Sequence, residues 1–159
     1  MLLLLLCAGS AYGLAALAAW RDTHGLLVNA SASLPNWAFF LDRSKAPQLG
    51  DIIFFQPPAS PLLVRHFGPA PRPFGKIVLG VAGDRVTVVN RHFLVNGRPV
   101  GRAKLQSRLG QALALGPTGI IPPNCYFVGT PHPDSFDSRY AGIGWVCRRQ
   151  LLGVGKAIL

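Results

Sequence analysis

The sequence contains no glutamate, and aspartate supplies all six of its acidic residues. Twelve arginines and four lysines outweigh them, which gives a formal net charge of +10. Nucleic acid and anionic membrane lipid are the two candidate partners of such a surface. The basic residues are scattered rather than gathered into one helix or run. We therefore predict a domain that lies close to lipid headgroups and binds no nucleic acid.

Patterns that bind metal are also missing. The three cysteines include no Cys-x-x-Cys pair, and the four histidines are dispersed along the chain. Because zinc sites draw on clustered cysteine and histidine, the sequence predicts no metal site. Cys125 and Cys147 lie in two late apolar stretches. They would form a disulfide outside the cytoplasm if those stretches are neighbouring strands, and two buried free thiols are the alternative.

Residues 1–20 carry no charge at all, and Arg21 and Asp22 end the run. Twenty helical residues span about 30 Å, the thickness of a bilayer core. A cleavable secretory signal would begin with basic residues, which are absent here, and a buried core helix would show a polar face. We predict an uncleaved transmembrane anchor over residues 1–20 and one domain over residues 21–159.

The orientation of that anchor does not follow from charge. Every lysine and arginine follows the anchor, and the positive-inside rule taken literally would place residues 21–159 in the cytoplasm. Long domains escape that rule, so both orientations stay open at this point.

Strand patterns dominate the rest of the chain, and Asn96-Gly97 is a strong hairpin signal. A proline-rich loop is expected over residues 57–73, with a brief strand at 62–64, and a short helix over 102–116. The fold class is therefore mainly β with one N-terminal transmembrane helix. The predicted strands are residues 51–55, 76–81, 86–89, 93–95, 98–100, 125–128 and 144–147.

Three segments carry candidate chemistry. Ser31-Ala-Ser33-Leu-Pro35 is a turn that can present a serine hydroxyl, although on this segment alone a solvated turn is the better explanation. Lys76 stands among apolar residues, where loss of hydration lowers the pKa of an amine until it can act as a base. A lysine that extends its amine to the surface is the alternative. In residues 134–140, Asp137 can pair with Arg139, and Ser135 can hydrogen-bond an amine.

In this order, these segments resemble the type I signal peptidases, whose first motif is Ser-x-Ser, an apolar residue and proline. The resemblance makes Ser33 the nucleophile and Ser31 a hydroxyl of the oxyanion hole. A Gly-Asp that opens an apolar strand is matched at Gly50-Asp51. The lysine motif is matched by Lys76, Gly80, Gly83 and Asp84, with Ile77 and Ala82 in place of arginine and proline.

The last motif of the family is matched by Ser135-Phe-Asp137-Ser138-Arg139-Tyr140. The resemblance makes Ser135 the residue that orients the Lys76 amine. It also implies a signal-peptidase-like antiparallel β domain and a Ser–Lys dyad that needs no cofactor. Within the family, the chain looks most like the TraF-type conjugative-transfer peptidases, which are short and process a pilin subunit.

The resemblance implies a membrane-anchored serine endopeptidase that processes an exported preprotein or pro-pilin, by hydrolysis or by cyclisation. We expect a monomer, single-pass in the inner membrane, with the catalytic domain on the periplasmic side and membrane lipid as a further partner. General removal of signal peptides is one alternative, and a self-cleaving repressor-type protease is another. A third is a membrane-tethered β-domain of a secretion or conjugation apparatus that has no enzymatic activity.

Overall fold

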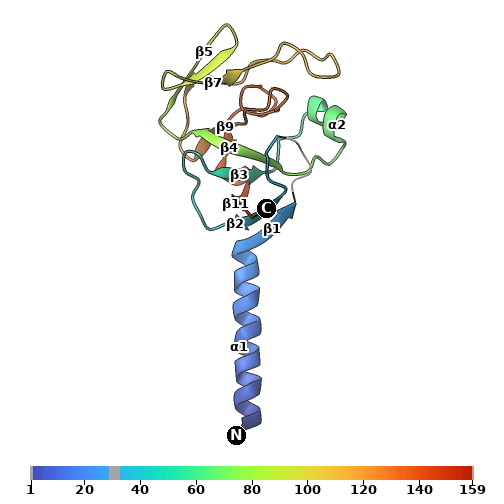
Figure 1. The fold of residues 1–159 in the computed structure, drawn as a ribbon, viewed down its shortest axis with the longest axis vertical. Coiled ribbons are helices and arrows are strands. Elements are labelled where there is room, and N and C mark those ends of the chain that lie inside the picture. The colour runs from blue at the N-terminus through green and yellow to red at the C-terminus, as the bar shows by residue number, and fades with distance from the viewer. Residues whose placement is uncertain (1, 29–32, 159) are drawn as a thin grey trace.

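The computed structural model describes residues 2–28 and 33–158. One long helix, α1 (Leu2–Thr23), runs away from a β-rich body and carries the N-terminus at its far end (Figure 1). Its last turn is held against the body by Arg43, whose backbone N–H donates to the Thr23 carbonyl over 2.8 Å. The Trp20 and His24 rings stack at this junction, with their centroids 5.1 Å apart.

The larger sheet has seven strands, and each neighbouring pair within it is antiparallel. The C-terminal strand lies between the second and third strands, so the end of the chain joins the two halves of the sheet. In spatial order the strands are β1 (His24–Val28), β2 (Ala38–Asp42), β11 (Leu151–Ala157), β3 (Ile52–Phe55), β4 (Phe74–Gly80), β9 (Cys125–Gly129) and β10 (Val146–Cys147).

A smaller antiparallel sheet is built around the predicted hairpin at Asn96-Gly97. Both turn residues have positive φ, 49° and 78°, which is the conformation that a two-residue type I′ turn requires. The Asn96 carboxamide also accepts a hydrogen bond from the Arg85 N–H over 2.8 Å. In spatial order the strands are β7 (Arg98–Arg102), β6 (His92–Val95), β5 (Arg85–Val89) and β8 (Gly119–Ile120).

Apolar side chains from both sheets meet in a shared core. Phe93 from β6 packs beside Phe127 from β9, with ring centroids 5.6 Å apart, and both rings are fully buried. A second cluster lies under the larger sheet and includes Phe39 of β2 and Phe54 of β3. A third is centred on β3, β4 and β9. The body is therefore mainly β and antiparallel, as predicted.

Most of the predicted strands are present within one or two residues of their expected bounds. The last prediction, residues 144–147, is reduced to the two residues of β10. The strands β1, β2, β8 and β11 were not predicted. In β11, two glycines and a lysine among seven residues obscure the apolar pattern, and pairing on both sides stabilises the strand instead.

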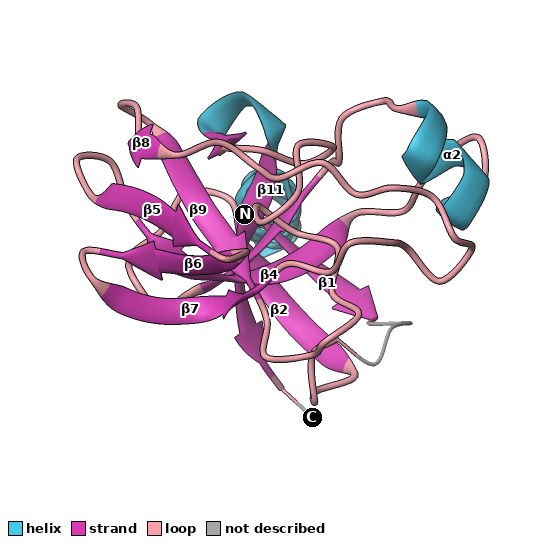
Figure 2. Cartoon of the chain, turned by 90° about the horizontal axis from the view of Figure 1, so that it is seen from above, coloured by secondary structure: helices cyan, strands magenta, loops and turns pink. Residues whose placement is uncertain are grey.

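The brief strand predicted at residues 62–64 is wrong, because these residues belong to helix α2 (Pro61–Phe67). The Ser60 hydroxyl caps the helix by accepting from the Leu63 N–H over 3.2 Å. Pro61 occupies the first helical position, where its fixed φ favours a helix and its missing N–H costs nothing. In both views α2 lies away from β5–β7, on the other side of β4 (Figure 2).

The short helix predicted over residues 102–116 is also wrong. Residues 105–113 form a hairpin-like turn, in which the Leu113 N–H donates to the Leu105 carbonyl over 2.8 Å. The Ser107 hydroxyl accepts from the Leu109 and Gln111 N–H groups at 3.2 Å each. Serine side chains that bond nearby backbone in this way compete with helix formation.

The segment predicted as a membrane anchor is helical and extends three residues beyond residue 20. In the described part of the chain, no helix has both the length and the apolar character needed to span a membrane. The anchor over residues 1–20, and with it the division from a domain over 21–159, stays a prediction.

Cys125 and Cys147 form a disulfide, which decides between the two alternatives left open by the sequence. The two residues face one another in the β9–β10 pair. The bond therefore ties β10, the short edge strand of the larger sheet, to its neighbour β9. It closes a loop with a sequence separation of 22 residues.

Replacing both cysteines with alanine is expected to lower the free energy of unfolding by about 3 kcal/mol, because a loop of about this length gains that much chain entropy on unfolding. Urea denaturation with and without dithiothreitol measures the effect. The reductant should destabilise the natural protein by a similar amount and leave the double variant unchanged. If dithiothreitol left the free energy of unfolding of the natural protein unchanged, the result would contradict the disulfide.

Candidate functional site

A cavity of about 830 Å³ brings together three of the predicted site residues, Ser33, Lys76 and Ser135. They come from the segment after β1, from β4 and from the loop after β9. The cavity is walled by α2, by the turn at 105–113 and by the loop 132–136. Ser31, the predicted oxyanion-hole residue, lies outside the described residues.

Ser33 and Lys76 line one cavity because their sequence neighbours pack together: Leu34 follows Ser33, and Gly75 precedes Lys76. Leu34 is buried in the cluster under the larger sheet. A Cβ added to Gly75 would meet the Leu34 side chain at 2.9 Å and the Phe54 ring at 2.8 Å. Glycine at position 75 therefore leaves room for Leu34 to lie against β4, one residue before Lys76.

Lys76 lies on the face of β4 that points into the core. Alternate residues of this strand are buried, and Lys76 occupies the same face as Val78. Its side chain is 5% exposed, and its amine lies 5.6 Å from the centroid of the Phe74 ring. A cation in these surroundings has lost most of its hydration.

That burial lowers the pKa of Lys76 to about 8. The negative charge of Asp137 opposes the shift, and the positive charge of Arg139 adds to it. At pH 7 about one in ten such amines is neutral, whereas an ordinary lysine is neutral about once in three thousand. Lys76 is therefore suited to accept a proton at physiological pH.

Ser135 supplies a hydroxyl with no hydrogen-bond partner among the described residues. The residue is 3% exposed and lines the same cavity as Lys76. Its backbone is fixed, because its N–H donates to the His132 carbonyl over 3.1 Å and its carbonyl accepts from Arg139 over 3.4 Å. A buried hydroxyl left unsatisfied is costly, and it is available to an amine or a substrate in the cavity.

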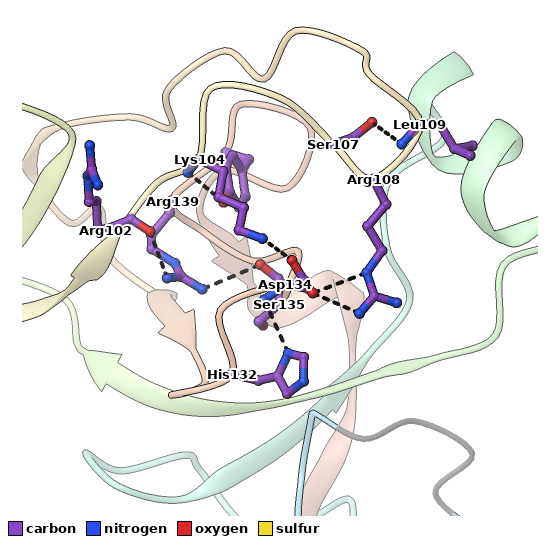
Figure 3. Close-up of polar contacts among 10 residues, drawn as sticks. Arg102, Lys104, Ser107, Arg108, Leu109, His132, Asp134, Ser135 and Arg139 are labelled. Atoms are coloured by element: carbon purple, nitrogen blue, oxygen red, sulfur yellow. Dashed lines mark hydrogen bonds and ion pairs between the residues drawn. The ribbon is translucent and has the colours of Figure 1, made fainter.

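Asp137 and Arg139 form the charge-assisted pair that the sequence predicted. Arg139 Nε donates to Asp137 Oδ1 over 2.8 Å, and Arg139 Nη2 donates to Oδ2 over 2.7 Å. Both side chains are almost fully buried. Arg139 Nη1 also donates to the Arg102 carbonyl over 3.1 Å (Figure 3), so the pair ties the Ser135 loop to the end of β7.

Sequence reasoning missed most of the cavity wall. Asp134 lines the cavity together with the two cations that bind it, Lys104 and Arg108 (Figure 3). His66 and Phe67 of α2 line it as well. Asp134 lies in the candidate segment 134–140, but the sequence suggested no role for it. The others lie in segments assigned to a loop and to a helix that does not form.

Comparison with known proteins agrees with the expected family. Residues 1–159 match the family described as signal peptidase, peptidase S26. The chain is 32% identical over 158 residues to a probable conjugal transfer protein TraF of Sinorhizobium fredii (strain NBRC 101917 / NGR234), which covers 89% of this chain and 80% of that protein. It is 28% identical over 152 residues to the conjugal transfer protein TraF of Agrobacterium tumefaciens (strain 15955), which covers 87% and 86%.

Among solved structures, a signal peptidase I from Enterococcus faecalis V583 aligns with a TM-score of 0.43 and 26% sequence identity. The alignment covers 69% of this chain and 97% of that one.

Asp137→Ala is expected to lower the free energy of unfolding by about 3–5 kcal/mol, because it leaves the buried Arg139 cation without its partner. The exposed Lys45–Asp51 pair provides a control, and Lys45→Ala should cost less than about 1 kcal/mol. Chemical denaturation of both variants measures the difference. Equal, small losses in the two variants would contradict a buried, energetically coupled pair.

Proposed function

The chain belongs to the signal peptidase family, peptidase S26, and we propose that it is a membrane-anchored serine endopeptidase with a Ser33–Lys76 dyad. The observation that carries the proposal is the cavity in which Ser33, the desolvated Lys76 amine and the unsatisfied Ser135 hydroxyl are gathered. A serine hydroxyl is a weak nucleophile until a base removes its proton. Lys76 is the residue of this cavity whose burial suits it to that role.

In the proposed reaction, neutral Lys76 accepts the Ser33 proton while Oγ attacks the scissile carbonyl. The Ser33 N–H and the Ser31 hydroxyl stabilise the resulting oxyanion, and Ser135 orients the lysine amine. The ammonium of Lys76 then returns the proton to the leaving amine, which leaves an acyl group on Ser33. Water or a peptide amine attacks this ester, with Lys76 again as the base, and gives a hydrolysed or a cyclised product.

The substrate we propose is an exported preprotein, and specifically a pro-pilin of a conjugation system. The proteins named as conjugal transfer protein TraF support the narrower substrate. The family description supports general signal-peptide cleavage as the second candidate. An extended substrate would add to a sheet by backbone hydrogen bonds, and β1 is an edge strand whose end leads into the cavity.

We further propose that residues 1–20 anchor a monomer in the inner membrane, with the body on the periplasmic side. The uncharged run of 20 residues supports the anchor. The Cys125–Cys147 disulfide supports the orientation, because such bonds persist in oxidising compartments and are rare in the cytosol. The net charge of +10 favours contact with anionic lipid rather than with nucleic acid.

Ser33→Ala and Lys76→Ala should each abolish cleavage, with a loss of at least about 1,000-fold, because each removes one member of the dyad. Membranes containing each variant are incubated with a pro-pilin and with a signal-peptide precursor, and products are identified by mass spectrometry. Ser44→Ala and Lys45→Ala replace the same residue types outside the cavity and should keep full activity. Full activity of either dyad variant contradicts the mechanism, and preference between the two substrates separates the two candidate functions.

The rate should depend on pH through Lys76. Because its pKa is about 8, kcat/KM should rise about tenfold per pH unit below pH 8 and level off above it. Peptide cleavage measured from pH 5.5 to 9.5 tests this. Lys76→Arg should be inactive across the whole range, since a guanidinium stays protonated. A flat profile in the natural protein would show that Lys76 is not the base.

A further inference from the structure

Asp134 is held by two cations at the wall of the cavity. Its carboxylate accepts hydrogen bonds from the Lys104 amine and from Arg108, whose Nη2 lies 2.7 Å and Nε 3.1 Å from Oδ2 (Figure 3). These two bonds from Arg108 form a geometrically fixed contact rather than a diffuse attraction. The cations also lower the pKa of Asp134 to about 2, so the carboxylate is ionised throughout the working range.

The partners of Asp134 come from a segment that is itself fixed. The Lys104 N–H donates to the Tyr140 hydroxyl over 3.0 Å. Arg91 donates to the carbonyls of Ala103 and Leu113 at 3.0 and 2.9 Å, so it braces the turn at both ends. The carboxylate is therefore bound by a segment whose backbone is hydrogen-bonded to the body at Ala103, Lys104 and Leu113.

Asp134 is covalently joined to Ser135, the buried hydroxyl without a partner in the described chain. On the other side of Ser135, the Asp137–Arg139 pair fixes the backbone through the Ser135 carbonyl. His132 Nδ1 accepts from the Asp134 N–H over 3.1 Å and closes the turn between them. Among the described residues, the Asp134 carboxylate links the loop before Ser135 to Lys104 and Arg108 in the facing segment of the cavity wall.

We propose that Asp134, bound by Lys104 and Arg108, is a positioning residue that fixes the Ser135 hydroxyl toward the Lys76 amine. The inference rests on the proposed Ser33–Lys76 mechanism and adds a residue that the family motifs do not include. Misplacement of a catalytic contact by about 1 Å can cost about 100-fold in rate. An ion-pair contact beside Ser135 is therefore able to control turnover without touching the substrate.

The effect acts through geometry and not through charge. The groups that shift the Lys76 pKa are its own burial, Asp137 and Arg139, and Asp134 is not among them. Loss of the Asp134 charge should therefore leave the protonation of Lys76 unchanged. A positioning role and an electrostatic role thus predict different pH profiles.

Asp134→Ala should lower kcat for a cleavable peptide at least tenfold, with KM within about twofold and the pH midpoint still near 8. Asp134→Asn keeps one oxygen that can accept from Arg108 and should lose less. Lys45→Gln breaks an ion pair of similar exposure outside the cavity and should change nothing. Unchanged kcat in Asp134→Ala, or a pH midpoint moved by more than half a unit, would overturn the proposal.

A double-mutant comparison of Asp134 with its partner cation Arg108 provides a second measurement of kcat. Lys104→Gln and Arg108→Gln should each lower kcat, and adding Arg108→Gln to Asp134→Ala should cost less than twofold more, because the contact is already lost. Fully additive losses would mean that the cations act on substrate rather than through Asp134. Thermal unfolding of each variant separates these effects from global destabilisation.

A serine-reactive phosphonate distinguishes this inference from the mechanism on which it rests. If the natural protein is not labelled at Ser33, the proposed function fails. If the natural protein is labelled and Asp134→Ala is labelled at the same rate, only the positioning role fails. Slower labelling of Asp134→Ala, with the Lys45→Gln control unchanged, is the result we expect.

Discussion

The burial of one lysine amine on the core face of β4 is the constraint on which the rest of the site depends. A buried cation is unfavourable, and the fold lowers that cost by letting the amine lose its proton more easily than in water. The same desolvation that costs stability makes Lys76 a usable base near neutral pH. A strand face holds the residue in place, because flanking positions on that face pack into the core.

The charges of Asp137 and Arg139 have to offset one another if burial is to lower the pKa of Lys76. Asp137 alone would favour the ammonium form of Lys76, and Arg139 alone would favour the neutral amine. The two residues are joined by two hydrogen bonds and are both buried, so they act on Lys76 as a nearly neutral unit. The pair thus stabilises the Ser135 loop without strongly favouring the charged form of Lys76, as a lone buried aspartate would.

The sequence allowed prediction of features that depend on local pattern or on motifs. The Asn96-Gly97 turn, the apolar strands and the Asp137–Arg139 pair follow from residue type and spacing, and the structure contains them. Helix α2 was missed because its signal is the cap formed by Ser60 and Pro61, within a proline-rich stretch that indicates a loop. The cavity wall at Asp134, Lys104 and Arg108 depends on contacts across 26 to 30 residues, which no local pattern specifies.

The order of strands explains how residues so far apart in sequence form one cavity. Lys76 lies in β4, whose neighbours are β3, which carries Phe54, and β9, which leads into the Ser135 loop. Ser33 joins this group through Leu34, which packs with Phe54. However, β2, which follows Ser33, does not pair with β3 in the sheet, because the C-terminal strand β11 lies between them. The C-terminal strand therefore joins the part of the sheet that supports Ser33 to the part that holds Lys76, and both residues depend on its pairing with β2 and β3.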